Sequence, residues 1–313
     1  MSAISSSSYS GHVLVLFGPT ASGKTSIAVD LAQRLPVEVV SADSRQIRKR
    51  MSIGTAAPSE TERTLVPHHL VSVVEPDAPW TVTDWLSGAH AALSDIWSRG
   101  RLPLLVAGTG YYAWSLLEGR SIPKVAPNLE LRSELERLAE DQGSEALHEL
   151  LAERDPRSAR RIESRNVRRV VRALEIIDAT NAPVPSLRRD PPNFTWTAVG
   201  LQWPRSLLYE RADRRATEMY DAGLLEETRS LVMRYGDRFE ALRSIGYAEA
   251  LQVIEGNWSS DQALLRTQSE THRLIRMQGT WFRKDDSRIH WLDARIHDNV
   301  LTAIEEKALS HVR

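Results

Sequence analysis

VLVLFGPTASGKT, residues 13–25, is the stretch of sequence that decides the fold of this chain. Residues 13–17 form a short apolar run, typical of a buried strand, and residues 26–35 have the apolar spacing of a helix. Between them lies the pattern Gly-x-x-x-x-Gly-Lys-Thr of a phosphate-binding loop. This strand–loop–helix order predicts the opening unit of a parallel α/β fold. The loop residues are Gly18, Pro19, Thr20, Ala21, Ser22, Gly23, Lys24 and Thr25.

The chemistry of such a loop is phosphate binding. Its glycines let backbone N–H groups turn toward phosphate oxygens, and the next helix points its positive dipole end at the same anion. Lys24 would place a charge on the terminal phosphate, and the Thr25 hydroxyl would be a ligand for Mg²⁺. The motif is typical of nucleotide-binding and ATP-binding proteins. It does not by itself predict hydrolysis, because residues 103–106 lead into Ala-Gly-Thr-Gly instead of a magnesium-holding acid.

Strand and helix patterns alternate at both ends of the chain. The expected strands are residues 13–17, 38–40, 70–74, 103–106, 196–201 and 289–292. The expected helices include residues 83–98, beginning at Thr81 or Thr83, most of residues 205–283, and residues 299–309. Such alternation favours a parallel sheet covered on both faces. The predicted fold class is therefore α/β, a P-loop NTPase-like parallel sheet flanked by helices.

The middle of the chain has a different pattern. Residues 127–182 show helical spacing and no strand signal, and proline-rich segments precede and follow them. We therefore expect an all-helical insertion domain at residues 126–192. Residues 1–125 and 193–313 would together form the catalytic core.

Composition excludes several classes of protein. The 313 residues contain no cysteine, which excludes disulfides, zinc–thiolate sites and a cysteine nucleophile. The net charge is −1, so a nucleic-acid surface would have to come from local clustering of the 40 Lys and Arg residues. The apolar run at residues 13–17 is too short for a signal peptide or a membrane span. We expect a cytoplasmic protein, with a monomer as the default state.

Two polar residues follow predicted strands. Asp43 comes after the strand at residues 38–40, and Thr109 comes after the strand at residues 103–106. Because the carboxyl ends of parallel strands meet at one edge of a sheet, we expect both residues beside the phosphate loop. Asp43 could be a metal ligand or a general base there; the alternative is a solvated carboxylate in a loop.

The chain resembles the bacterial tRNA dimethylallyltransferases, also called tRNA isopentenyltransferases, from about residue 13 to residue 294. Each short match is weak except the phosphate loop, but their order and spacing make the combination specific. The matching segments are GPTASGKT at 18–25, SADSRQ at 41–46, IGTA at 53–56, VPHHL at 66–70, GTGYY at 108–112, RALEI at 172–176, LRSIGY at 242–247 and QGTWFR at 278–283.

The resemblance implies a reaction and its site residues. Dimethylallyl diphosphate would bind with its diphosphate on the phosphate loop and Mg²⁺. Lys24, Thr25 and Arg215 would stabilise the charge of the leaving diphosphate. Asp43 would accept a proton from the N6 amine of adenosine 37 in tRNA, and Thr109 would position Asp43 or the amine. The catalytic residues implied are thus Asp43, Thr109, Lys24 and Arg215, and the metal ligand is Thr25.

The helical insertion would bind the anticodon stem-loop of the tRNA. Arginines from residue 157 to residue 172 would lie largely on one side of a continuous helix, with a possible break at residues 164–166. RNA phosphates are the natural partners of such a stripe; a solvated face paired with neighbouring glutamates is the alternative. The tRNA-binding residues implied are Asp43, Ser44, Arg45, Gln46, Thr109, Arg132, Asn166, Arg168, Arg169, Arg172, Arg243, Gly246, Tyr247, Arg276, Gln278, Trp281 and Arg283.

Several positions depart from the family pattern, mostly in segments expected to contact RNA or the prenyl donor. They are Arg48, Arg50, Ser52, Ala57, Ala107, Asn166, Ala248 and Met277. One interpretation is a divergent tRNA enzyme in which Arg48, Lys49 and Arg50 replace missing phosphate contacts. Another is a relative that prenylates free AMP, although a nucleotide acceptor would not need the helical insertion. A P-loop kinase or an NTP-dependent RNA-binding protein is the alternative from a different class.

Overall fold

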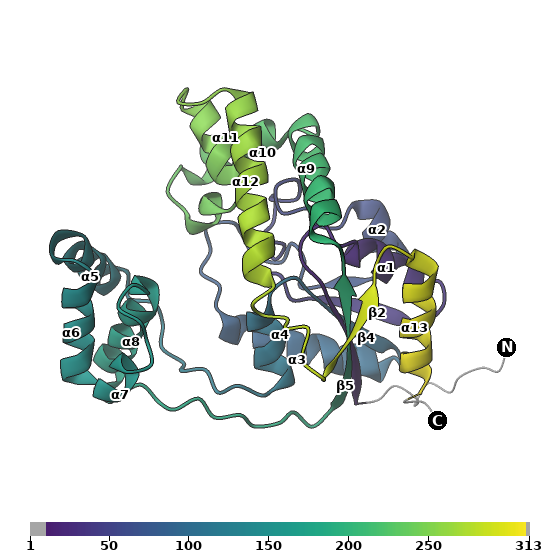
Figure 1. Cartoon of the computed structure of the whole chain (residues 1–313), viewed down its shortest axis with the longest axis horizontal. Helices are drawn as coiled ribbons and strands as arrows, with labels where there is room; N and C mark the ends of the chain where they lie inside the picture. Colours follow the sequence, from purple (N-terminus) through teal and green to yellow (C-terminus); the bar gives the residue numbers. More distant parts are fainter. Residues whose placement is uncertain (1–10, 311–313) are drawn as a thin grey trace. The chain divides into compact units, whose positions relative to one another are not determined.

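The computed structural model describes residues 11–310 (Figure 1). The chain divides into two compact units, one formed by residues up to 119 together with residues from 191 onward, the other by residues 120–190. The sequence had placed the second unit at residues 126–192. None of the helices within residues 11–310 is long and apolar enough to cross a membrane.

A six-stranded sheet forms the centre of the larger unit. Its strands are β1 (His12–Phe17), β2 (Val37–Ser41), β3 (His68–His69), β4 (Leu102–Ala107), β5 (Thr195–Gln202) and β6 (Ile289–Asp293). Their order is β3-β2-β4-β1-β5-β6, and every pair is parallel. The predicted fold class, a parallel sheet flanked by helices, is confirmed.

Side chains of β1 alternate between two cores, one on each face of the sheet. Val13, Val15 and Phe17 pack with α3 (Val82–Ser98) and α4 (Gly110–Leu117). Leu14 and Leu16 pack with α1 (Lys24–Leu31) and α13 (His297–Leu309). Burying one such side chain contributes about 1.5–3 kcal/mol, so this alternation holds β1 at the centre of the sheet. The phosphate loop therefore follows a fully buried central strand.

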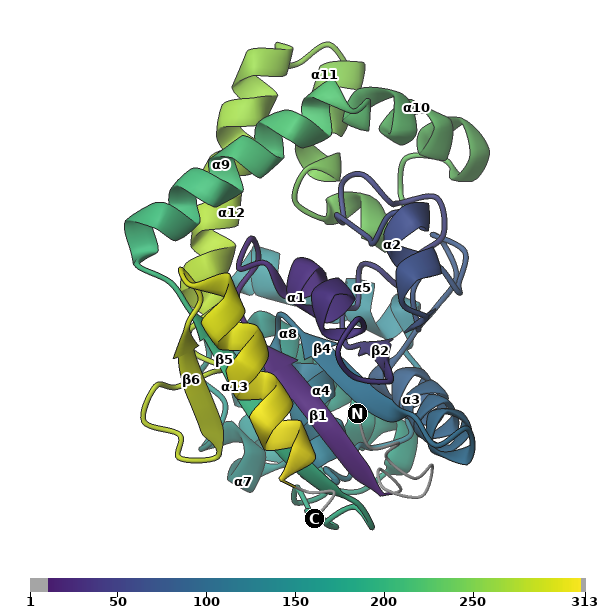
Figure 2. The ribbon, with the colours of Figure 1, turned by 90° about the vertical axis from the view of Figure 1, so that its right-hand side faces the viewer.

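A group of helices follows β5 in the same unit. It comprises α9 (Arg205–Asp221), α10 (Leu224–Tyr235), a short 3₁₀ turn η1 (Glu240–Arg243), α11 (Tyr247–Ile254) and α12 (Ser260–Gln278). Figure 2 shows this group above the carboxyl end of the sheet, next to the segment that leads into α2 (Glu60–Leu65). Leu224, Leu231 and Tyr247 form its own small core together with Met51.

The smaller unit contains four helices in the described chain: α5 (Leu129–Gln142), α6 (Ser144–Arg154), α7 (Pro156–Ala159) and α8 (Val167–Thr180). Leu135, Leu147, Leu151 and Leu174 are buried in a core that the unit forms by itself. Side chains cap three of the helices: Asn128 caps α5, Asp155 caps α7 and Asn166 caps α8. The segment is not one continuous helix, because α7 ends at Ala159 and α8 begins only at Val167, so the break considered at residues 164–166 is present.

One expected strand is wrong. Residues 70–74 do not form a strand; the neighbour of β2 is the two-residue strand β3, which ends just before them. Leu70 (φ 62°) and Ser72 (φ 53°) have left-handed backbone conformations, which interrupt an extended strand. The segment instead bonds to the loop after Asp43, with the Ser72 N–H donating to the Gln46 carbonyl at 2.8 Å.

Candidate active site at the carboxyl edge of the sheet

The phosphate loop ends in a helix start that is open to an anion. Gly23 (φ 92°) is in the left-handed region at the N-cap of α1, and no side chain caps this helix. The first N–H groups of α1 are therefore available to phosphate oxygens. Lys24 Nζ donates to the carbonyls of Gly18 (2.9 Å) and Pro19 (2.8 Å), so the lysine is folded back over the loop.

Side chains from distant segments donate hydrogen bonds to two backbone carbonyls of this loop. Arg211 Nε donates to the Ala21 carbonyl at 2.8 Å, and Trp203 Nε1 donates to the Ser22 carbonyl at 3.0 Å. The Arg211 guanidinium also lies 4.4 Å from the centre of the Trp203 ring. These contacts fix the loop's backbone from β5 and α9. Neither Arg211 nor Trp203 was predicted from the sequence.

Gln278 is a loop contact rather than an exposed RNA contact. Its side chain is only 5% exposed, and its Oε1 atom accepts a hydrogen bond from the Thr20 N–H at 2.9 Å. The sequence had grouped it with the tRNA-binding residues. The structure places this amide against the phosphate loop instead, where it is buried.

Asp43 lies directly after β2, at the same edge of the sheet as the phosphate loop. Its Oδ1 atom accepts hydrogen bonds from the backbone N–H groups of Arg45 (2.7 Å) and Gln46 (3.3 Å), which orients the carboxylate. Its Oδ2 atom accepts no hydrogen bond from residues 11–310. One oxygen is therefore held while the other is available to take a proton.

Thr109 follows β4 and is the N-cap residue of α4, where its side chain makes no capping hydrogen bond. A Cβ atom placed on the preceding Gly108 would lie 3.7 Å from Lys24 Nζ and 3.3 Å from Gln278 Nε2. The β4–α4 turn is therefore packed against the phosphate loop. Asp43, Thr109 and Lys24 follow the neighbouring strands β2, β4 and β1, as the sequence predicted from the geometry of parallel sheets.

Positive charge is concentrated at this edge. Burial, together with repulsion from Arg215, lowers the pKa of Lys24 to about 7, although Asp43 partly opposes this effect. Burial also lowers the pKa of Arg215, again opposed by Asp43. Two partly buried cations beside one carboxylate leave room for additional negative charge, and a bound diphosphate would supply it.

Tyr112 is a further residue at this edge that the sequence analysis did not single out. It stacks on the ring of Trp85, with 4.9 Å between the ring centres. Burial raises the pKa of Tyr112 to about 12, and the nearby Asp43 adds to the rise. The phenol therefore stays protonated. Its position in the segment GTGYY at residues 108–112 is the signal that could have identified it.

The remaining predicted tRNA contacts of the larger unit divide into exposed and buried side chains. Ser44, Arg45 and Arg243 are exposed. Arg276 donates to the Tyr209 hydroxyl at 3.3 Å, and Arg283 pairs with Asp285 at 2.7 Å, both at the surface. Trp281 is partly buried, and its ring centre lies 6.4 Å from that of Tyr111.

Tyr247 does not present its side chain to RNA. It is completely buried, and its hydroxyl donates to Glu227 at 2.5 Å. Gly246 is buried beside it with a left-handed backbone (φ 92°). The prediction of direct tRNA contacts at these two positions is therefore not met by the structure, because both residues serve internal packing.

Two of the predicted tRNA-binding arginines in the smaller unit are internal partners of Glu175. Arg132 pairs with the buried Glu175 carboxylate through Nε (2.9 Å) and Nη2 (3.0 Å), and Arg172 pairs with the same group. Burial alone would raise the pKa of Glu175, but the hydrogen bonds from Arg132 and Arg172 lower it below its ordinary value. These two arginines are thus structural, whereas Arg168 and Arg169 are exposed at the start of α8.

The arginine stripe is not a single helical face. Residues 160–166 interrupt the helix between α7 and α8, which separates the stripe into two groups. Asn166 caps α8 by accepting the Arg169 N–H at 3.3 Å, so its side chain has a structural task. The exposed members of the stripe are Arg157, Arg160, Arg161, Arg165, Arg168 and Arg169.

The side chains of the basic cluster Arg48–Arg50 contact residues 75–78 of the protein, and a role for them in phosphate binding stays a prediction. Arg48 donates to the carbonyls of Glu75 (3.1 Å) and Ala78. Lys49 pairs with the Glu75 carboxylate at 3.0 Å, and Arg50 lies 3.8 Å from it. The three side chains anchor the loop that leads toward α3.

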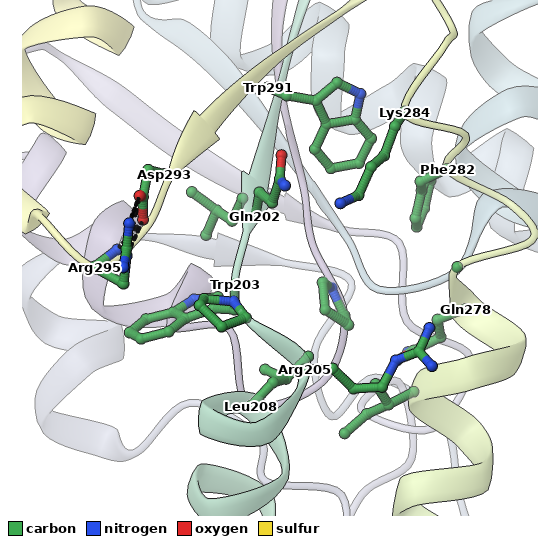
Figure 3. Close-up of a pocket in the computed structure, with 15 residues that line it drawn as sticks. Gln202, Trp203, Arg205, Leu208, Gln278, Phe282, Lys284, Trp291, Asp293 and Arg295 are labelled. Atoms are coloured by element: carbon green, nitrogen blue, oxygen red, sulfur yellow. Dashed lines mark hydrogen bonds and ion pairs between the residues drawn. The ribbon is translucent and has the colours of Figure 1, made fainter.

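A cavity of about 740 Å³ borders the phosphate loop from the other side (Figure 3). It lies at the ends of β5 and β6, whereas Asp43 and Thr109 follow β2 and β4. In the view of Figure 3, Lys284 extends toward Gln202 beneath the ring of Trp291. Asp43 and Thr109 therefore lie on one side of β1 and the cavity on the other. Pro19 of the phosphate loop and Gln278, which bonds to that loop, line the cavity.

Comparison with known proteins identifies the family. The IPP transferase profile matches residues 46–285, and the Isopentenyl transferase profile matches residues 11–66. A tRNA dimethylallyltransferase of Herpetosiphon aurantiacus is 42% identical over 296 residues, which cover 94% of this chain and 93% of the relative. A tRNA dimethylallyltransferase of Roseiflexus castenholzii is 44% identical over 274 residues, with 87% and 90% covered.

Solved structures agree. The full-length tRNA isopentenylpyrophosphate transferase of Bacillus halodurans matches with a TM-score of 0.71 at 33% identity, covering 96% of this chain and 97% of the other. A eukaryotic dimethylallyltransferase acting on tRNA shares the fold, with a TM-score of 0.75, 24% identity, and 96% and 80% covered. Fold and site thus define a P-loop prenyltransferase. The chain belongs to the IPP transferase family, and its resemblance to the tRNA dimethylallyltransferases is confirmed.

Proposed function

We propose that this enzyme transfers a dimethylallyl group from dimethylallyl diphosphate to N6 of adenosine 37 in tRNA, releasing diphosphate. The observation that carries this proposal is the meeting of Asp43, Lys24 and Arg215 at one edge of the sheet. There Arg215 helps to lower the pKa of Lys24, and the charge of Asp43 acts to raise the pKa of both cations. A carboxylate beside two cations suits a reaction in which an amine loses a proton and an anion leaves.

The donor would bind through its diphosphate. The uncapped N-terminus of α1 and the backbone of the phosphate loop would bind the phosphate oxygens. Lys24 would exchange its bonds to the Gly18 and Pro19 carbonyls for bonds to the diphosphate. Arg215 would hold the second cationic position, so negative charge on the leaving oxygen would meet preorganised donors.

Mg²⁺ is part of the proposal. Residues 11–310 contain no group of three or more His, Asp or Glu side chains that could hold a metal by themselves. This fits an ion bound mainly by substrate phosphates and a single protein hydroxyl, the usual mode for Mg²⁺ at phosphate sites. Thr25, the second residue of α1, would be that ligand. The ion would neutralise charge on the diphosphate.

Asp43 would act as the general base. In the transfer, the N6 nitrogen forms a bond to C1 of the dimethylallyl group while the bond from C1 to the diphosphate oxygen breaks. The proton released from N6 goes to Asp43, through the oxygen that accepts no backbone hydrogen bond. Thr109 would orient the amine. The exocyclic amine is a weak nucleophile, so alignment contributes as much as proton transfer.

The acceptor would be the anticodon stem-loop of tRNA. Its target adenine has to leave the base stack to reach Asp43. The exposed arginines of the smaller unit, Arg168 and Arg169 among them, would bind backbone phosphates of the stem. Residues 126–192 would thus act as the tRNA-gripping insertion, and the α/β core as the catalytic part. We further propose that the enzyme acts in the cytoplasm as a monomer.

Transfer of label tests the proposal. Purified protein, Mg²⁺ and labelled dimethylallyl diphosphate are offered unmodified tRNA and, separately, AMP, with Asp43→Ala protein alongside. We expect label in tRNA, at N6 of adenosine 37 after nuclease digestion, and its loss with Asp43→Ala. Label in AMP alone would move the enzyme to nucleotide prenylation. Consumption of ATP without transfer to either acceptor would favour the P-loop NTPase alternative.

A further inference from the structure

The loop at residues 51–57 is bound by the carboxylate of Glu227, which is far from the loop in sequence. Glu227, on α10, accepts hydrogen bonds from the backbone N–H groups of Ser52 (3.0 Å), Ile53 (3.1 Å) and Gly54 (3.3 Å). The Ser52 hydroxyl donates to it as well, at 3.1 Å. Consecutive N–H groups that converge on one anion form a backbone anion site, and here a side chain of the protein itself fills it.

Tyr247 completes this arrangement from α11. Its hydroxyl donates to Glu227 Oε1 at 2.5 Å and accepts the Gly54 N–H at 3.2 Å. Burial raises the pKa of Tyr247, so the phenol keeps the proton that it donates. A Cβ atom at residue 54 would lie 2.4 Å from the Tyr247 ring, so only glycine fits there. The loop is therefore held against both α10 and α11.

The same loop also contacts residues that interact with Asp43. The Ala56 carbonyl accepts hydrogen bonds from Gln46 Nε2 (3.0 Å) and from Arg215 Nη2 (3.4 Å). Gln46 also donates its backbone N–H to Asp43 Oδ1 at 3.3 Å, and its side-chain oxygen accepts from Ser41 at 3.3 Å. A single carbonyl of the loop thus contacts the two groups that flank Asp43.

We propose that Glu227 is a positioning residue for prenyl transfer. By fixing residues 51–57 it sets the Ala56 carbonyl, and through that carbonyl it places Arg215 and Gln46 around Asp43. This inference rests on the proposed function, in which Asp43 takes the proton and Arg215 stabilises the leaving diphosphate. A displacement of reacting groups by about 1 Å costs on the order of 10²-fold in rate, so loosening the loop acts on kcat.

Glu227→Gln tests the inference, because it replaces one acceptor oxygen with an NH₂ group that opposes the backbone N–H groups of the loop. We expect kcat to fall about 10- to 100-fold, with KM for tRNA and for the donor within about threefold of the wild-type values. The matched control is Glu226→Gln, which removes an exposed charge on the same helix whose partner is Arg229 (3.0 Å). The control should keep the wild-type kcat.

A purely structural role would give a different result. Loss of packing alone lowers the melting temperature and the active fraction, and kcat per active site stays unchanged. Active-site titration with the donor in a single turnover therefore separates the two roles. A kcat of Glu227→Gln within twofold of wild type, per titrated site, would overturn the inference.

Tyr247→Phe is the second variant, and it decides the matter if Glu227→Gln fails to fold. It keeps the ring that packs on Gly54 and removes only the hydroxyl, so we expect a folded protein with kcat lowered about 3- to 10-fold, the cost of about one hydrogen bond. A folded Tyr247→Phe protein with wild-type kcat would contradict the inference.

A double-mutant cycle tests the route from Glu227 to Asp43. If Glu227 acts through Gln46, then Glu227→Gln combined with Gln46→Met lowers kcat little more than the worse single variant. Multiplying effects would show independent sites and overturn the route. If Asp43→Ala is inactive while Glu227→Gln is fully active, only this inference is contradicted. Full activity of Asp43→Ala would sink the proposed function.

Discussion

The cations at the carboxyl edge of the sheet and those of the helical unit differ in what surrounds them. Lys24 and Arg215 are bonded to backbone carbonyls, and burial lowers the pKa of both. Arg168 and Arg169 are exposed at the start of α8. Buried charges can act on a transition state in a preorganised way, whereas exposed charges contribute screened attraction. Substitutions in the first region should therefore change kcat, and those in the second the affinity for RNA.

The largest effect is expected at Asp43. Asp43→Asn keeps an oxygen for the Arg45 N–H but cannot accept a proton, so kcat should fall by about 10²–10⁴-fold. KM for tRNA should change little, because shape and backbone contacts remain. Single-turnover transfer of labelled prenyl group to tRNA measures the rate. Asp237→Asn, at an exposed pair with Arg238, is the control; a wild-type rate in the Asp43→Asn protein would break the assignment of the base.

The pH dependence of donor binding tests whether the cations at the carboxyl edge of the sheet differ from the exposed arginines of the helical unit. In the protein without ligand, Lys24 has a pKa of about 7. The negative charge of a bound diphosphate is expected to raise it. Above pH 7, binding must therefore take up a proton, and affinity should fall by up to about tenfold per pH unit. Calorimetry at pH 8 in two buffers of different ionisation enthalpy measures that uptake. Lys24→Arg, which stays charged, should show none; equal uptake in both proteins would contradict the role of Lys24.

The residues that follow the strands at the carboxyl ends of the sheet were predicted from the sequence better than the long-range contacts that hold them in place. Asp43, Thr109 and Lys24 could be brought together in advance because parallel strands align their carboxyl ends. The contact of Glu227 with residues 53 and 54 joins positions more than 170 residues apart, and no local sequence pattern predicts it. Arg132 and Arg172 were assigned to RNA by the family resemblance, whereas both pair with the buried Glu175 carboxylate. For Arg172, the alternative of pairing with neighbouring glutamates describes the structure better. The left-handed conformations of Leu70 and Ser72 were not predicted either, because neither residue type favours them.

A smaller effect is expected at the exposed arginines of α8. Arg168→Ala and Arg169→Ala should each raise KM for tRNA about 3- to 10-fold and leave kcat near the wild-type value. Removing one phosphate contact lowers the slope of log affinity against log salt by about one. Filter binding of tRNA at several salt concentrations measures it. Arg229→Ala, an exposed arginine on α10, is the control; an unchanged salt slope would exclude both arginines from the interface.

The smallest effect on activity is expected at Arg132, although it is an arginine in the same unit. Arg132→Ala removes two hydrogen bonds to Glu175 (2.9 and 3.0 Å) and leaves those from Arg172 and the Asn128 N–H (2.7 Å). The free energy of local unfolding should fall by about 1–3 kcal/mol. Hydrogen exchange of amides in α5 and α8 measures that change.

Binding of tRNA by Arg132→Ala should keep the wild-type salt slope, with KM within about twofold. The control is Arg137→Ala, on the same helix, where the side chain is exposed and donates to the Ser133 carbonyl at 3.3 Å. If Arg132→Ala instead lowers the salt slope by about one, as expected for Arg168→Ala, then Arg132 exchanges Glu175 for an RNA phosphate on binding. In that case the buried and exposed arginines of the unit would form a single RNA surface in the complex.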